Sequence, residues 1–198
     1  MRGGLGRGSF YASLFRVSPY GCLKHPLSQH VSIFKEFILQ TAMEKATFGA
    51  GCFWGVEAAF RKMEGVKSTS VGYMGGHFPN PCYLDVLSRI TGHAEVVQVE
   101  YDPESVSYDD LLAVFWDIHD PTTLNRQGAD KGEQYRSVIF CHNVQQLERA
   151  QQSKAKLQIS GKFEQNIVTQ IKPASEYYLA TAEHQQYFEK KARRYSVS

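Results

Sequence analysis

Residues 49–55 read Gly49-Ala50-Gly51-Cys52-Phe53-Trp54-Gly55. The apolar residues 46–48 precede this stretch, and apolar side chains at helical spacing follow it. The pattern predicts a strand, a tight glycine turn and a helix, with Cys52 at the helix N-terminus. Backbone N–H groups without partners and the helix dipole favour a thiolate at such a position. We therefore expect Cys52 to be a nucleophile, with its pKa lowered, beside an apolar surface.

Outward from this stretch, period-two and period-3.6 patterns recur along the chain. No helical pattern separates the second and third strands, which favours antiparallel pairing over a doubly wound sheet. We expect an α+β fold: a two-layer sandwich with a ferredoxin-like mixed sheet, helices on one face and long active-site loops. The predicted strands are 46–50, 66–73, 94–101, 137–142 and 167–171, and the predicted helices are 53–63, 108–119, 144–157 and 182–194.

The composition is that of a globular protein, with 42% hydrophobic and 13% aromatic residues in 198. The net charge of +2 is unevenly distributed, because residues 1–35 hold five basic residues and no acid. From Glu36 onward, 17 basic and 20 acidic residues give a net charge of −3. This excludes a nucleic-acid footprint on the body of the protein. No apolar run approaches the roughly 20 residues of a membrane helix, so we expect no membrane binding. We also expect a monomer that does not bind nucleic acid.

Residues 1–43 form a poorly patterned N-terminal extension, rich in Gly, Ser and Arg. The segment is either a tail or a targeting segment, because organellar transit peptides are basic, Ser-rich and poor in acids. We expect the catalytic domain to span residues 44–198. The expected location is the cytoplasm, with an organelle as the alternative if the segment is a transit peptide.

The four cysteines (Cys22, Cys52, Cys82 and Cys141) form neither a CxxC pair nor a zinc-binding spacing. They therefore indicate a reducing compartment rather than a disulfide framework.

Two long segments without periodicity, 74–93 and 120–135, carry many residues that do chemistry. Loops of this length in a compact domain are often functional. Together with the start of the third strand they supply two carboxyl groups and two phenols in addition to Cys52: Glu95, Asp130, Tyr83 and Tyr135.

Three motifs in this order and spacing resemble the peptide methionine sulfoxide reductase A family. They are Gly-Cys-Phe-Trp-Gly at 51–55, Thr-Gly-His-Ala-Glu at 91–95 and Gln-Tyr-Arg-Ser at 134–137. The resemblance covers about three quarters of the chain, from Met43 to about Lys191. It implies reduction of the S epimer of methionine sulfoxide, free or in a protein, without metal or organic cofactor. Its implied purpose is the repair of oxidative damage.

The resemblance also implies roles for the two reacting groups. Cys52 would attack the sulfoxide sulfur and become a sulfenic acid, while Glu95 would donate a proton to the sulfoxide oxygen. A carboxyl that donates must be neutral, so we expect a poorly solvated pocket to raise the pKa of Glu95. The sulfenic acid can be reversed by a thiol.

Five more residues would bind the substrate in such an enzyme. Tyr83 and Tyr135 would donate O–H bonds to the sulfoxide oxygen, where negative charge develops. Phe53 and Trp54 would pack against the methyl group, and Asp130 would orient the site through bound water.

The chain departs from the family in its cysteines. Many members carry resolving cysteines in a C-terminal tail, whereas this sequence has none after Cys141. Regeneration by an external reductant (thioredoxin, glutaredoxin or a small thiol) is therefore expected. Cys82 is an alternative resolving residue if its Cα lies within about 4.4–6.8 Å of that of Cys52. Cys141 is expected to be a buried strand residue, and Cys22 to need a mobile segment.

Three other interpretations remain at this stage. His93 and His119 could join Glu95 in a metal site, although their spacing fits no zinc signature. Either histidine could serve a Cys–His hydrolase that forms an acyl-Cys52. A module that binds oxidised methionine without turnover is the third interpretation. We expect His93 to support the entry to its strand, and the helix around His184 to be structural support.

Overall fold

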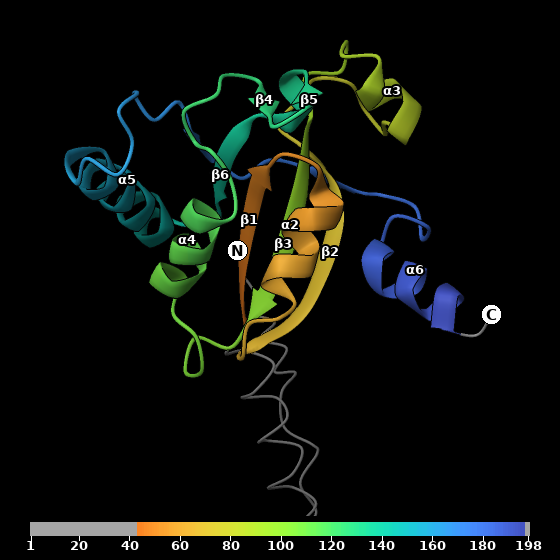
Figure 1. Cartoon of the computed structure of the whole chain (residues 1–198), viewed down its shortest axis with the longest axis horizontal. Helices are drawn as coiled ribbons and strands as arrows, with labels where there is room; N and C mark the ends of the chain where they lie inside the picture. Colours follow the sequence, from red (N-terminus) through yellow and green to blue (C-terminus); the bar gives the residue numbers. More distant parts are fainter. Residues whose placement is uncertain (1–42, 197–198) are drawn as a thin grey trace, which may run out of the picture. The chain divides into compact units, whose positions relative to one another are not determined.

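The computed structural model of the chain describes residues 43–196, in which one mixed six-stranded sheet dominates (Figure 1). The expectation for residues 1–43 therefore lies outside the described residues, apart from Met43. The strand order across the sheet is β7-β6-β1-β3-β2-β8. The strands are β1 (Glu44–Ala50), β2 (Val66–Met74), β3 (Ala94–Tyr101), β6 (Ser137–Cys141), β7 (Gln170–Pro173) and β8 (Tyr177–Leu179).

The centre of the sheet has ferredoxin-like topology. The chain runs β1, α2 (Phe53–Phe60), β2, β3, α4 (Tyr108–Asp117) and β6, and these four strands pair antiparallel in the order β6-β1-β3-β2. After α5 (Val144–Ile159), β7 joins the edge parallel to β6, and β8 pairs antiparallel with β2. The expected α+β fold with a mixed sheet is thus confirmed.

The main core lies between one face of the sheet and the helices. Alternate residues of β1 and β3 point into it, and Phe48 stacks on Phe60 of α2 and Phe115 of α4 with ring centroids 5.0 and 5.3 Å apart. Glu95 begins the same alternation in β3 as the core residues Val97 and Val99. The carboxyl therefore belongs to the helix-covered face, at the end of the sheet where β1 turns into α2.

Short elements that the sequence did not reveal line this end of the sheet (Figure 1). They are α3 (Tyr83–Leu87), the hairpin of β4 (Arg126–Gln127) and β5 (Asp130–Lys131), and the 3₁₀ turn η1 (Glu133–Tyr135). α3 forms within a segment that was expected to be a loop, because the Asp85 carboxylate caps its N-terminus by accepting the Cys82 N–H at 2.8 Å.

The C-terminal prediction was wrong in its details. The helix predicted for 182–194 begins at Tyr187, as α6 (Tyr187–Ser196). Gln186 has a φ of +47°, which a right-handed helix does not allow. The strand predicted for 167–171 is β7 at 170–173, and β8 was not expected. No helix between residues 43 and 196 is long and apolar enough to cross a membrane.

Candidate active site

Cys52 is the N-cap residue of α2, directly after β1 and a turn at Gly51 with a φ of +95°. Its carbonyl oxygen accepts the N–H of Gly55 at 3.2 Å. A Cβ on Gly51 would lie 2.7 Å from Cγ of Gln127 in β4, so the turn passes close beneath the β4–β5 hairpin. Glycine is therefore required here both for the positive φ and for this close approach.

Glu95 lies next to Cys52, because its carboxyl accepts a hydrogen bond from the backbone of the following residue. The N–H of Phe53 donates to Oε2 of Glu95 at 3.1 Å, and the Glu95 side chain is buried. Burial raises the pKa of Glu95 to about 7, and the charge of Asp130 adds to the rise, while the Phe53 hydrogen bond opposes it. A substantial fraction of Glu95 is therefore protonated at neutral pH and able to donate, as the sequence led us to expect.

The pKa of Cys52 moves opposite to our expectation. Burial raises it from 9.0 to about 11, the charge of Glu95 adds to the rise, and hydrogen bonds from the N–H groups of Trp54 and Gly55 oppose it. The favourable effect of the helix N-terminus is present, but desolvation outweighs it. Without substrate, Cys52 is a thiol rather than a thiolate.

The two phenols and the second carboxylate come from the short elements above Cys52. Tyr83 begins α3, Tyr135 ends η1 and Asp130 begins β5. Burial raises the pKa of Tyr135 to about 12, with further rises from the charges of Glu95 and its neighbours, and burial and Glu95 likewise raise the pKa of Tyr83. Both phenols therefore remain protonated donors beside Glu95 and Cys52.

An aromatic wall closes one side of the site. We use this name for four residues whose rings lie in a continuous row: Phe53, Trp54, His184 and Tyr187. The Trp54 and Tyr187 rings stack with centroids 3.9 Å apart, and Trp54 Nε1–H donates to Nδ1 of His184 at 3.2 Å. Phe53 is buried and Trp54 half-buried, so Trp54 presents the more accessible apolar surface.

Sequence reasoning missed the place of His184 in this wall. It lies before α6 rather than within a supporting helix, and its ring also lies 4.5 Å from that of Tyr83. Burial lowers the pKa of His184, which fits a neutral ring that accepts the Trp54 N–H. The Phe53-Trp54 pair alone could have indicated a need for further aromatic partners.

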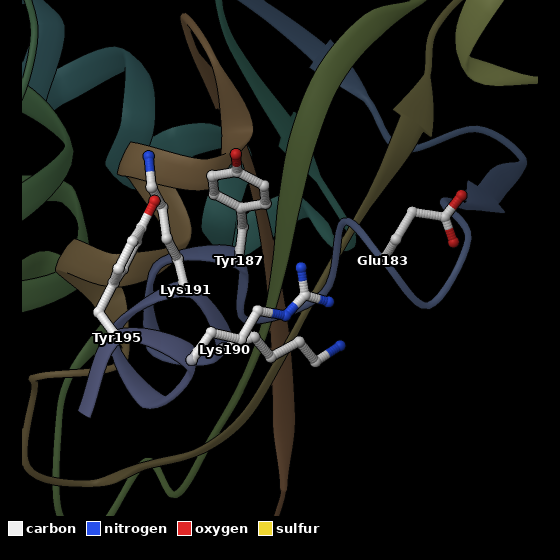
Figure 2. Close-up of a pocket in the computed structure, with 6 residues that line it drawn as sticks. Glu183, Tyr187, Lys190, Lys191 and Tyr195 are labelled. Carbon is white, nitrogen blue, oxygen red and sulfur yellow. The ribbon is translucent and has the colours of Figure 1, made fainter. Parts of the chain in front are cut away.

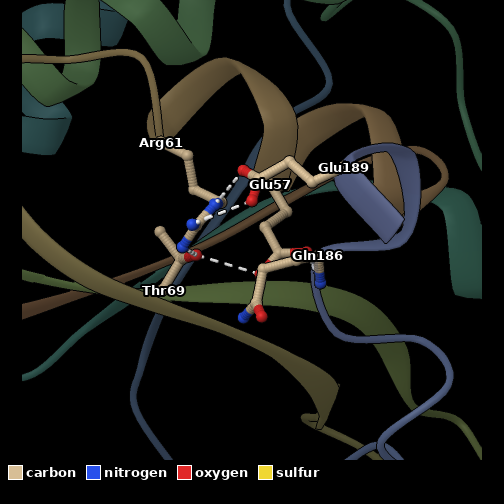
Figure 3. Close-up of polar contacts among 5 residues, drawn as sticks. All are labelled: Glu57, Arg61, Thr69, Gln186 and Glu189. Atoms are coloured by element: carbon tan, nitrogen blue, oxygen red, sulfur yellow. Dashed lines mark hydrogen bonds and ion pairs between the residues drawn. The ribbon is translucent and has the colours of Figure 1, made fainter. Parts of the chain in front are cut away.

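A buried carboxyl, that of Glu57, links α2 to the segment that precedes α6 (Figure 3). Glu57 of α2 accepts the Thr69 hydroxyl at 2.9 Å and the backbone N–H of Gln186 at 2.7 Å. One turn further on, Arg61 makes a two-pronged ion pair with Glu189 of α6, at 2.5 and 3.2 Å. These contacts fix the segment that carries His184 and Tyr187.

Tyr73 is a second residue near the site that the sequence analysis did not identify. It lies directly opposite Glu95 in the β2–β3 ladder, and its ring is 5.8 Å from that of Phe53. The side chain is 1% exposed, and its hydroxyl has no hydrogen-bond partner among the described residues. A buried hydroxyl without a partner is destabilising in the free protein.

His93 and His119 have structural roles that leave neither ring free for a metal or a nucleophile. His93 accepts the Gly76 N–H on Nδ1 at 3.0 Å, and its Nε2 contacts the Phe78 carbonyl oxygen at 2.8 Å, so it links the loop before α3 to the start of β3. Both ring nitrogens of His119 are likewise engaged, with the Phe115 carbonyl and the Ser137 hydroxyl. Within residues 43–196, no three His, Cys, Asp or Glu side chains are grouped so as to hold a metal ion.

The remaining cysteines differ in access. Cys82 is exposed at the N-cap of α3, whereas Cys141 is buried in β6. All three cysteines between residues 43 and 196 are free thiols. Cys22 lies outside the described residues, so its expected role stays a prediction.

A thiol, a buried carboxyl with a raised pKa and two phenols beside one aromatic wall are the groups expected of a thiol-dependent enzyme that acts on a polar, oxygen-bearing group. The family model described as peptide methionine sulfoxide reductase matches residues 44–198. The chain therefore belongs to the peptide methionine sulfoxide reductase family.

Individual relatives agree with this membership. "Peptide methionine sulfoxide reductase MsrA 1" of Nostoc sp. is 83% identical over 155 residues, which cover 78% of this chain and 95% of the relative. Reduced Mxr1 from Saccharomyces cerevisiae superposes with a TM-score of 0.72 at 36% identity, covering 77% of this chain and 87% of Mxr1. Mxr1 in complex with Trx2 gives a TM-score of 0.53 at 29% identity, with coverage of 74% and 86%.

Proposed function

We propose that the protein reduces the S epimer of methionine sulfoxide, free or within a polypeptide, to methionine. The observation that carries the proposal is the position of Glu95, whose carboxyl accepts the N–H of the residue that follows Cys52. This arrangement holds a proton donor beside the nucleophile at the place where a sulfoxide oxygen would develop negative charge.

The proposed reaction conserves atoms and electrons. The Cys52 sulfur attacks the sulfoxide sulfur, the sulfur–oxygen bond of the substrate breaks, and the oxygen ends on Cys52 as a sulfenic acid. The substrate sulfur gains the two electrons that the Cys52 sulfur loses. Tyr83 and Tyr135 hold the sulfoxide oxygen, Phe53 and Trp54 pack against the methyl group, and Asp130 orients the site through bound water.

Cys52 must lose its proton to react, whereas Glu95 must keep its proton to donate it, and each of these states favours the other. The charge of a deprotonated Glu95 raises the pKa of Cys52, so protonation of Glu95 makes the thiol easier to ionise. A bound sulfoxide favours the neutral carboxyl because only that form can donate to its oxygen. Substrate binding therefore promotes formation of the thiolate at the moment it is needed.

We propose that an external dithiol or thiol regenerates Cys52. One thiol attacks the sulfenic acid and releases water, and a second thiol then frees Cys52 and leaves a disulfide. Thioredoxin is the first candidate, supported by the complex of the related Mxr1 with Trx2, and glutaredoxin or a small thiol is the alternative. Cys82 stays a candidate internal resolving residue.

Single-turnover reduction without any reductant tests this function. Separated S and R epimers of a blocked methionine sulfoxide are mixed with the protein, and methionine, free thiols and protein mass are then measured. We expect one methionine per protein from the S epimer alone, with one thiol lost and a trappable sulfenic acid. The Cys52→Ser variant should form none.

Other outcomes would change the proposal. Two thiols lost would indicate Cys82 or Cys22 as an internal resolving residue. If Cys82 is that residue, the Cys82→Ser variant should lose only one thiol. No methionine from either epimer, with binding retained, would indicate a binding module instead of an enzyme. Ester or amide cleavage through an acylated Cys52 would indicate a hydrolase.

We further propose that the protein acts as a monomer in the cytoplasm, or in an organelle if residues 1–43 act as a transit peptide. Sedimentation equilibrium checks the monomer, and fractionation of cells expressing the full chain checks the location.

A further inference from the structure

A basic hollow of about 590 Å³ lies at the C-terminal helix (Figure 2). We use the name basic hollow for the space lined by Glu183, Tyr187, Lys190, Lys191, Arg194 and Tyr195. Five of the six come from α6, at spacings of one helical turn, and the sixth precedes it.

The basic hollow adjoins the aromatic wall through one shared residue. The Tyr187 ring stacks on Trp54, with centroids 3.9 Å apart, and the same side chain lines the hollow. Trp54 is two residues from Cys52. An extended polypeptide spans about 3.3–3.6 Å per residue, which makes the hollow a candidate contact for residues that flank an oxidised methionine bound at Cys52.

The charge of the basic hollow differs from that of the protein body. Its lining holds three cations and one carboxylate, whereas residues 36–198 carry a net charge of −3. Glu183 interacts with the charge of Lys190, whose amine also donates to the Ala182 carbonyl at 2.5 Å. Lys191 and Arg194 are both exposed, and Lys191 lies 5.9 Å from the centre of the Tyr187 ring.

These two cations beside aromatic rings fit a flexible carboxylate from outside the protein. The aromatic rings offer contact to the methylene groups of an acidic side chain, and the cations attract its carboxylate. A lysine or arginine side chain in the same place would be repelled by the excess positive charge.

We propose that the basic hollow is a subsite for an acidic side chain that flanks the oxidised methionine in a polypeptide substrate. The inference rests on the proposed function, because it assigns the hollow to the substrate of Cys52. It predicts that the protein reduces methionine sulfoxide fastest within acidic sequences.

Two matched pairs of short blocked peptides provide the test. Each pair has Glu in one peptide and the isosteric Gln in the other, placed two residues before the methionine sulfoxide in the first pair and two residues after it in the second. With dithiothreitol as the reductant, kcat/KM is measured for each peptide and for blocked methionine sulfoxide. We expect the Glu peptide of one pair to be preferred by about three- to tenfold at low salt, from two exposed charge contacts. The preference should fall to about one in 1 M salt, where the screening length is about 3 Å.

Charge-neutral variants locate the effect. The Lys191→Gln/Arg194→Gln double variant should reduce the Glu-to-Gln preference to about one. The matched control, Lys156→Gln/Lys172→Gln, removes two exposed cations on α5 and β7 and should retain the preference. Blocked methionine sulfoxide reports whether each variant keeps a competent site.

Several results would overturn the inference. A preference of about one in both peptide pairs, or a preference that survives in the Lys191→Gln/Arg194→Gln variant, would refute the subsite even though blocked methionine sulfoxide is reduced. If the Lys191→Gln/Arg194→Gln variant keeps the Glu-to-Gln preference with dithiothreitol but turns over more slowly with thioredoxin as the reductant, the basic hollow would belong to the reductant instead. Failure to reduce blocked methionine sulfoxide would refute the proposed function itself, and the inference with it.

Discussion

Glu95 should make the free energy of unfolding depend on pH, and this dependence should be absent in the Glu95→Gln variant, whose side chain does not titrate. Its pKa rises from 4.5 to about 7 on folding because burial disfavours the charged form. The folded state therefore binds more protons than the unfolded state between these values, and the free energy of unfolding falls as the pH rises through this window. At about 1.36 kcal/mol for each tenfold change in proton affinity, the loss amounts to about 3 kcal/mol between pH 4 and pH 8.

Urea denaturation of the wild type and the Glu95→Gln variant at several pH values measures this loss. The amide side chain of the variant does not titrate, so the difference in free energy of unfolding between the two proteins should move by about 3 kcal/mol in favour of the variant from pH 4 to pH 8. Other titrating groups, including His119, cancel in the difference. The absolute difference at one pH depends on how the amide packs, whereas its change with pH reports the titration of Glu95.

A carboxyl in the same strand provides the control of opposite sign. Hydrogen bonds from Ser68 and Lys45 lower the pKa of Glu100, so its contribution to stability is present at neutral pH and lost as the pH falls. The excess in free energy of unfolding of the wild type over the Glu100→Gln variant should therefore fall as the pH falls. A flat Glu95→Gln difference, or one that moves in favour of the wild type as the pH rises, would refute the account of Glu95.

The other predictions concern Cys52, Tyr73 and Glu57. In the Glu95→Gln variant the pKa of Cys52 should fall from about 11 to a value that stays above 9.0, because burial, the larger cause of the rise, remains. The pH profile of Cys52 alkylation measures this pKa, with the Cys52→Ser variant as background. A higher pKa in the variant would contradict the prediction. Tyr73→Phe removes a buried hydroxyl without a partner, so the free energy of unfolding should stay level or rise by up to about 1 kcal/mol, whereas a loss would reveal a missed hydrogen bond. Glu57→Ala leaves the Gln186 N–H without its acceptor and should cost about 1–3 kcal/mol in urea unfolding; an unchanged midpoint would count against its role in holding the C-terminal segment.

The sheet could be predicted from the sequence because its strands carry local patterns. The alternation in 94–101 and the glycine turn at 49–51 placed β1, α2 and β3 within one or two residues, except that α2 ends at Phe60. The short elements could not be predicted in this way. β8 exists only because β2 offers an unpaired edge, and β4 and β5 have two residues each, too few for a period.

The site residues could be named from motifs, but not their electrostatic state. The Thr-Gly-His-Ala-Glu motif gives no sign that Glu95 accepts the Phe53 N–H, since that contact spans 42 residues. The helix N-terminus suggested an acidic Cys52, and the balance reversed because desolvation depends on the packing of distant segments. His184 escaped notice for the same reason: its partner Trp54 lies 130 residues away.

The protonated state of Cys52 has a consequence for the durability of the catalyst. With its pKa raised to about 11, Cys52 is almost entirely protonated at pH 7. Peroxides attack thiolates rather than thiols, so the idle site is a poor target for the oxidants that create its substrate. If Cys52 ionises on substrate binding, as proposed above, oxidants should inactivate the protein less readily between turnovers than they would an enzyme whose cysteine is a permanent thiolate.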